Sequence, residues 1–258
     1  MAHVLQDKFG TPIQDLRLAV ASRMFPGIIG VNKFFDGFVS TTRSTVWDGS
    51  GGNTLYPYIS TAGVATYASD SVEDAIGGTG IGSATFYGLD ENWDQVSETI
   101  VLTGTTPVVG TQIFKRLFRS HGNAPVGSVG TNVGNVTATV DGNIVAMITA
   151  EEGQTLMSPY TIPAGYSGYI THGKVSVAKA KSLVGEFVIR INIGATGPWR
   201  ISHHLNVFEN NYGYDFDPYA FIPEKTDVEF RSWVDVGTTR ISGGYDLYLI
   251  PDNYNPLA

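Results

Sequence analysis

The stretch Asn135-Val-Thr-Ala-Thr-Val-Asp-Gly-Asn-Ile-Val-Ala-Met-Ile-Thr149 decides the fold class. Two runs rich in β-branched residues, 135–140 and 143–149, flank the dipeptide Asp141-Gly142. A two-residue type I′ turn requires positive φ at both of its central residues, and Asp-Gly is one of the few dipeptides that adopts it readily. The stretch therefore predicts a β-hairpin.

Similar strand-like runs recur at short intervals on both sides of this hairpin. They alternate apolar and polar residues or are rich in β-branched and aromatic residues, and turn residues separate them. The runs are 83–87, 96–102, 112–119, 167–171, 174–178, 185–193, 200–208, 227–236 and 244–250. No long helical pattern alternates with them, which argues against a doubly wound fold. The sequence therefore predicts an all-β protein, an antiparallel β-sandwich of jelly-roll-like type.

The composition narrows the classes of partner. The chain of 258 residues carries a net charge of −8, whereas a nucleic-acid-binding surface needs clustered Lys and Arg, so no nucleic acid is expected. Charged residues make up only 16%, well below the usual quarter, which suggests that partner subunits cover part of the surface. The absence of cysteine excludes disulfides and Cys-ligated zinc, and it fits folding in a reducing cytosol.

Turn clusters suggest where the chain divides. The run Trp47-Asp-Gly-Ser-Gly-Gly-Asn53 and the segment 151–159 are the two candidate boundaries. We therefore expect two β modules, at 51–155 and 156–258, preceded by an extended N-terminal arm at 1–50. A single continuous sandwich with a long crossing loop remains an alternative.

The N-terminal arm is too apolar to be a free tail. Arg17, Arg23 and Pro26 interrupt its most apolar stretch, so no membrane-spanning segment is expected. Two readings stay open: the arm packs over its own domain, or it docks on a neighbouring subunit and buries its apolar side chains there. The candidate assembly residues are Met24, Phe25, Ile28, Ile29, Phe34, Phe35 and Phe38.

Two aromatic segments are candidates for binding at loop tips. Tyr56 and Tyr58 flank a proline, and Tyr212 and Tyr214 lie in an Asn- and Gly-rich run. Tyrosines on loops can stack on a glycan or anchor a protein interface. The alternative is that these rings fill a wide β core and cap its ends.

No pattern in the sequence supports catalysis, a cofactor or a metal. Asp90, Asn92 and Asp94 have the spacing that opens a calcium loop, but Gln95 stands where that loop needs glycine. The adjacent His203 and His204 point to opposite faces of a strand and do not easily share one ion. The sequence also has no nucleophile elbow and no phosphate-binding loop. We therefore expect a protein that is not an enzyme.

Several segments together resemble small structural proteins from the virions of tailed bacteriophages of the marine and cyanophage type. They are spread over residues 86–250, about two-thirds of the chain, and leave the first fifty residues unmatched. The segments are Phe86-Tyr-Gly-Leu-Asp90, Val96-Ser-Glu-Thr-Ile-Val-Leu-Thr-Gly-Thr-Thr-Pro107, Gly134-Asn-Val-Thr-Ala-Thr139, Gly153-Gln-Thr-Leu-Met157, Tyr160-Thr-Ile-Pro-Ala-Gly165 and Gly243-Gly-Tyr-Asp-Leu-Tyr-Leu-Ile250. The resemblance implies a β-sandwich virion component with no catalytic residues.

This resemblance sets the functional hypotheses. The first is a capsid decoration or cement protein, made in the host cytoplasm and located in the virion. Its expected partners are other virion proteins, either the major capsid or the tail and collar proteins, and it is expected to form a homo-oligomer, with a trimer as one option. The alternatives are a collar or tail-fibre component and a receptor- or glycan-binding module. A polysaccharide-degrading enzyme is a third class.

Overall fold

The computed structural model describes residues 16–51, 53–123, 130–178, 182–191, 197–208 and 211–254. Strands dominate this part of the chain, and all paired strands run antiparallel, which confirms the predicted all-β class. The helical elements are short: the α-helix α1 (Leu16–Ala21) and the 3-10 helix η1 (Asp48–Ser50). None of the described helices is long and apolar enough to cross a membrane.

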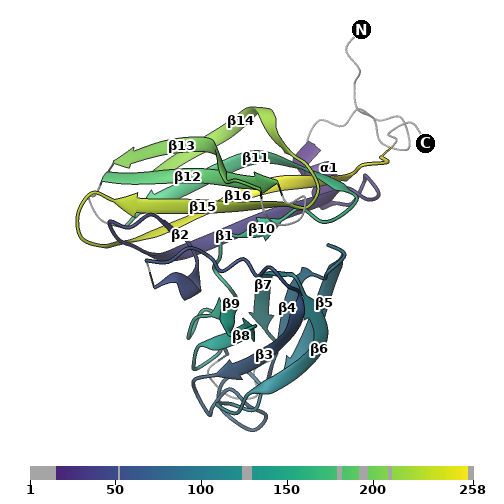
Figure 1. The fold of residues 1–258 in the computed structure, drawn as a ribbon, viewed down its shortest axis with the longest axis vertical. Coiled ribbons are helices and arrows are strands. Elements are labelled where there is room, and N and C mark those ends of the chain that lie inside the picture. Colours follow the sequence, from purple (N-terminus) through teal and green to yellow (C-terminus); the bar gives the residue numbers. More distant parts are fainter. Residues whose placement is uncertain are drawn as a thin grey trace.

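The upper part of Figure 1 is a sandwich of two sheets. The first sheet has the order β1 (Ile29–Val39), β16 (Thr239–Pro251), β11 (Tyr166–Val177), β14 (Asn211–Ile222). The second has the order β10 (Tyr160–Thr161), β15 (Thr226–Val234), β12 (Ser182–Ile191), β13 (Arg200–Phe208), and β2 (Ser44–Thr45) also pairs with β15. The chain crosses repeatedly between the two sheets, which is the arrangement of a jelly roll.

The strand pairing corrects the predicted N-terminal arm. Residues 29–39 form β1 and pair along their whole length with β16, the closing strand of the same sheet. Residues 44–45 pair with β15 in the opposite sheet. The first 50 residues therefore include two strands of the sandwich. The sequence hid β1 because Gly30 and Gly37 look like breaks, whereas both lie inside the continuous strand.

The lower part of Figure 1 is a second β unit, which the chain forms between β2 and β10. One of its sheets has the order β6 (Val108–Phe114), β3 (Gly63–Ser69), β8 (Val136–Val140), β9 (Asn143–Ile148). The other has the order β5 (Gln95–Val101), β4 (Ser83–Leu89), β7 (Arg116–Gly122). The hairpin expected from Asp141-Gly142 is confirmed, because β8 and β9 pair and the turn residues have φ of 49° and 74°.

The second unit is an insertion in the jelly roll. The chain leaves and re-enters the sandwich at one place: Trp47 bridges to Met157, and the backbone N–H of Ser158 donates to the carbonyl of Val46 at 3.0 Å. We call residues 53–157 the inserted unit. Figure 1 shows it projecting from the sandwich beside β1 and β10.

Each part has its own apolar core, and the two cores adjoin. The sandwich core is centred on stacked rings, with Phe35 and Phe230 separated by 4.9 Å between centroids and Phe187 edge-on to Phe230 at 5.0 Å. Leu89 and Phe118 of the inserted unit belong to this sandwich core. The inserted unit packs its remaining apolar side chains into a second cluster. The contact between the two parts is therefore continuous with a hydrophobic core.

Candidate functional site: a buried polar junction and an exposed aromatic face

The charged side of β15 is the most unusual feature of the junction. Val228 and Phe230 face the sandwich core, while Asp227, Glu229 and Arg231 alternate with them and face the other way. Such alternation normally indicates a strand with one solvated face. Here, however, all three charged residues are buried, because parts of the inserted unit and Trp199 cover them.

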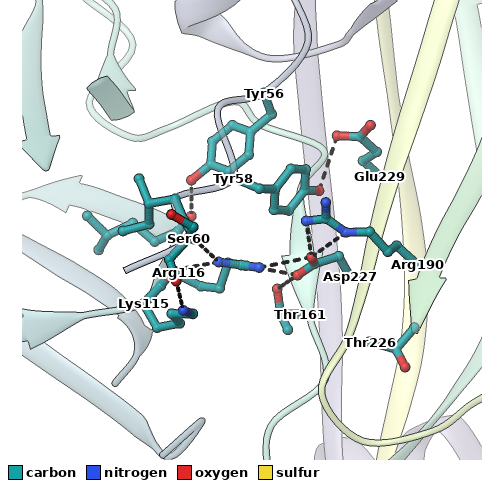
Figure 2. A network of polar contacts seen from close by, with 12 residues as sticks. Tyr56, Tyr58, Ser60, Lys115, Arg116, Thr161, Arg190, Thr226, Asp227 and Glu229 are labelled. Carbon is teal, nitrogen blue, oxygen red and sulfur yellow. Dashed lines mark hydrogen bonds and ion pairs between the residues drawn. The ribbon is translucent and has the colours of Figure 1, made fainter. Parts of the chain in front are cut away.

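Asp227 is the centre of the resulting network (Figure 2). Arg116, the first residue of β7, donates to both of its carboxylate oxygens, from Nε at 2.9 Å and from Nη2 at 3.1 Å. Arg190 of β12 donates to Oδ2 from Nη2 at 2.7 Å, and Thr161 of β10 donates to Oδ1 at 2.6 Å. Burial alone would raise the pKa of Asp227, but the charge of Arg116 and the hydrogen bonds from Arg116, Thr161 and Arg190 lower it.

Glu229 forms the second half of the network. It pairs with Arg231, and its Oε2 accepts hydrogen bonds from the hydroxyls of Thr45 at 3.0 Å and Tyr58 at 3.1 Å. Burial raises the pKa of Glu229, and the neighbouring charge and hydrogen bonds offset this only in part. The two carboxylates therefore differ in their ion pairs: Asp227 pairs with two arginines and Glu229 pairs with one.

Aromatic rings fill the spaces between the guanidinium groups. Tyr58 lies against Arg116 at 5.1 Å and Arg190 at 4.6 Å, measured from ring centroid to Cζ. Trp199 lies against Arg190 at 4.8 Å and Arg231 at 4.4 Å. Guanidinium groups over aromatic faces are stabilised when water is excluded. The network therefore fixes the inserted unit against the sandwich through planar, directional contacts.

The junction contradicts the predicted loop-tip role of Tyr56 and Tyr58. Tyr56 is buried, and its hydroxyl lies 2.8 Å from the carbonyl oxygen of Leu117 and 2.7 Å from that of Val145. Tyr58 donates to Glu229 and contacts two arginines, as described above. Both tyrosines precede β3 in the sequence, but the insertion folds them into the junction, where their hydroxyl groups are already engaged.

Tyr212 and Tyr214 are also not at a loop tip. They lie on β14, half-buried against the sandwich core. The ring of Tyr214 stacks on His203 at 4.1 Å and meets Phe216 edge-on at 5.0 Å. These contacts favour the core-filling alternative for this pair.

The predicted assembly residues separate into two groups. Phe35 is only 1% exposed and stacks on Phe230, so its prediction as an interface residue was wrong. Phe34 and Phe38, on the opposite side of β1, are 48% and 58% exposed. The remaining members lie at or before the start of β1, and all are exposed or half-buried: Met24, Phe25, Ile28 and Ile29.

Phe34 and Phe38 belong to a larger exposed surface. Across the first sheet, Phe34 lies opposite Gly244 of β16, which lies opposite Lys174 of β11, so these residues share one face. The far edge of the same sheet exposes Tyr219 and Phe221 on β14. We call the outer surface with Phe34, Phe38, Tyr219 and Phe221 the aromatic face. Two of its rings have close neighbours: the ammonium group of Lys174 lies 5.2 Å from the Phe34 centroid, and the ring of Tyr169 lies 5.6 Å from that of Phe221.

The described residues contain no group of three or more His, Cys, Asp or Glu side chains that could hold a metal ion. Asp90 instead closes a turn, because its Oδ1 accepts the backbone N–H groups of Asn92 at 2.8 Å and Asp94 at 3.0 Å. Arg116, from the most basic stretch of the sequence, is fully engaged with Asp227 and with backbone carbonyls.

Sequence reasoning did not find the junction. The pattern Asp227-Val-Glu-Phe-Arg231 carries three charges on one side of a strand, which would normally be assigned to solvent. The available signal was Arg116, which with Lys115 interrupts the apolar residues of strand 112–119, because an arginine that is buried among apolar side chains needs an acid partner. The sequence does not say which of 24 acids it meets.

Comparison with known proteins gives no family. No protein-family model matches the sequence, and no curated protein matches it. Among solved structures, similarity is found to infectious bursal disease virus of the Gx strain, with 11% identity over 89% of this chain and 74% of that one and a TM-score of 0.28. The structure of the Gt strain has 10% identity over 89% of this chain and 72% of that one, with a TM-score of 0.28. The structure of the VP2 subviral particle of that virus has 12% identity over 89% of this chain and 73% of that one, with a TM-score of 0.25. These values are too low to assign a family or a function.

Proposed function

We propose that this chain is a structural protein of a virus particle that acts through contacts between subunits rather than through catalysis. The observation that carries the proposal is the aromatic face, where four aromatic side chains are exposed at the two edges of one sheet. Open strand edges that carry exposed aromatic rings are a liability for a free monomer and normally mark a surface that another subunit covers.

Two further observations support this proposal. The jelly roll is an architecture that viral capsid domains use, although lectins and cupins use it as well, so this support is an analogy of fold. The buried junction holds a projecting unit at a fixed orientation, as a component of a regular particle requires. The finer assignment to capsid decoration or cement in a tailed bacteriophage rests on the sequence resemblance over residues 86–250.

The experiment changes the aromatic face without changing the core. Full-length protein and the double variant Phe34→Thr/Phe38→Thr are compared by sedimentation velocity over a wide concentration range. We expect the unaltered protein to form oligomers and the variant to remain monomeric, with an unchanged far-UV circular dichroism spectrum, because both side chains face outward. Phe208→Thr is the matched control, because this exposed phenylalanine lies on β13 of the opposite sheet.

Two outcomes would contradict the proposal. One is an unaltered protein that is monomeric throughout and absent from purified particles when their proteins are counted by mass spectrometry. The other is oligomerisation that survives the double substitution. Truncation of residues 1–45 is not a suitable test, because it removes β1 and β2 and so opens both sheets of the sandwich.

A further inference from the structure

A cleft lies between the sandwich and the inserted unit, outside the buried junction. It has a volume of about 570 Å³, within the range of small-molecule sites. One wall is the start of β1, from Ile29 to Lys33. The other is the outer surface of the β5-β4-β7 sheet, where Ser97, Tyr87 and Arg119 lie directly opposite one another on adjacent strands.

The cleft is lined by basic residues in an acidic protein. Its lining includes Lys33, Arg119 and His121, and none of its lining residues is Asp or Glu. The chain as a whole has 24 acidic and 16 basic residues, so acidic residues outnumber basic ones overall, whereas the cleft lining has only basic ones. Fields from like charges add inside a cleft with low-dielectric walls, which favours an anion there.

Lys33 is the most informative of these cations, because it is only 3% exposed. Its ammonium group donates to the carbonyl of Phe118, and none of the ion pairs found in the described part of the chain includes it. Burial, and then repulsion from Arg119, lower the pKa of Lys33, and attraction to Asp48 offsets this only in part. The charged form of this lysine is therefore costly when it has no ion-pair partner, and an anionic ligand beside it would favour that form.

The remaining lining residues indicate what the anion is attached to. Ser97 and Gln95 offer a hydroxyl and an amide, which both donate and accept hydrogen bonds, and the hydroxyl of Tyr87 lies 3.1 Å from Nε2 of His121. Ile29 and Val31 supply the apolar part of the wall. This combination suits a small ring with hydroxyl groups on its edge and apolar faces.

We propose that this cleft binds a sugar acid, with the carboxylate held by Lys33 and Arg119 and the hydroxyl groups by Gln95 and Ser97. This inference is independent of the aromatic face, which lies on the outer surface of the first sheet. It assigns the molecule a recognition function in addition to assembly.

The test uses a matched pair of ligands that differ only in the carboxylate. Binding of methyl glucuronide and of methyl glucoside to the full-length protein is measured by isothermal titration calorimetry, with inorganic phosphate as a third ligand. We expect saturable binding of the glucuronide and at least a tenfold loss with the glucoside. Lys33→Met and Arg119→Gln should each weaken glucuronide binding at least tenfold. Lys174→Met, which removes a lysine outside the cleft, should leave it unchanged.

Arg119 is exposed, so its substitution tests the site even if Lys33→Met fails to fold, as judged by circular dichroism. The proposal is overturned by a glucuronide that does not bind, or by binding that Arg119→Gln leaves intact. Phosphate that binds as tightly as the glucuronide would overturn the sugar-acid assignment.

Discussion

Asp227 illustrates how a single residue can hold two parts of a chain together. Its carboxylate receives two guanidinium groups and one hydroxyl, and each comes from a different strand. The pair with Arg116 joins the inserted unit to the sandwich, and the pair with Arg190 stays within the sandwich. Loss of the carboxylate charge would leave two buried cations without a partner, which is far more costly than the pair itself is favourable.

We expect Asp227→Asn to lower the free energy of unfolding by about 3 kcal/mol, the usual effect of breaking a buried ion pair from one side. Asp215→Asn is the control, because that carboxylate is 72% exposed and its contact with His172 is a surface pair. This control substitution should lower the free energy of unfolding by less than about 1 kcal/mol. Urea denaturation measures both values, and equal losses in the two variants would show that the junction adds no stability.

Asp48 should make stability depend on pH. It lies in η1 beside the boundary of the inserted unit, and its Oδ2 accepts the backbone N–H of Leu156 at 2.7 Å. Its Oδ1 is buried without a hydrogen-bond partner among the described residues. Burial raises the pKa of Asp48 from 3.8 to about 7, although the hydrogen bond from Leu156 opposes the shift.

The direction of this pH dependence follows from the linkage between proton binding and folding. Between pH 4 and 7 the folded protein keeps the Asp48 proton while the unfolded chain releases it, so this group lowers stability progressively as pH rises through that window. Asp48→Asn keeps the shape and cannot ionise. We therefore expect the melting temperature of the variant, relative to the unaltered protein, to increase from pH 4 to pH 7.5. A difference that does not change with pH would exclude an ionising Asp48.

At the scale of elements, the sequence predicted strands well and their partners poorly. The hairpin of β8 and β9 was predictable because its turn chemistry is local. The run 227–236 was also predicted as a strand, and β15 covers most of it. Its burial on both sides could not be predicted, because the covering residues Tyr58 and Arg116 lie more than a hundred positions earlier.

The strand β1 was missed for a related reason. Its pairing with β16 depends on Gly243 and Gly244, which resemble a turn when read along the sequence. In the structure they make room for β1: a Cβ added at Gly243 would lie 2.5 Å from the ring of Phe35, and one at Gly244 would lie 2.5 Å from the carbonyl of Lys33. These two glycines therefore allow β1 and β11 to pack closely against β16.

Gly243→Ala should therefore disturb a whole strand. We expect a loss of about 1–3 kcal/mol in the free energy of unfolding, the usual cost of forcing a group into a filled space. Faster hydrogen exchange of the β1 amides should accompany it. Gly213→Ala is the control, because the added carbon would approach no atom closer than 3.7 Å. If the two variants behaved alike, the close approach of β1 to β16 would not limit stability.

At the scale of the whole molecule, the junction determines whether the jelly roll and the inserted unit behave as one body. Two observations favour one body. Leu89 and Phe118 of the inserted unit are part of the sandwich core, and Arg116 spans the boundary to Asp227. The sequence suggested two β modules, but it gave no sign that one is inserted in the other, because the two ends of the insertion meet through long-range contacts such as that of Trp47 with Met157.

We expect the unaltered protein to unfold in a single cooperative transition, with equal calorimetric and van't Hoff enthalpies. Arg116→Met should keep much of the apolar stem but remove the charge that joins the two parts. The inserted unit retains its own core of buried side chains, so the variant should show two separable transitions in differential scanning calorimetry. Arg43→Met is the matched control, because the pair of Arg43 with Glu186 lies within the sandwich and should leave one transition. Two transitions in the unaltered protein would mean that the two parts are not coupled. One transition in Arg116→Met would mean that the apolar contact alone couples them and that the ion pair serves only to orient them.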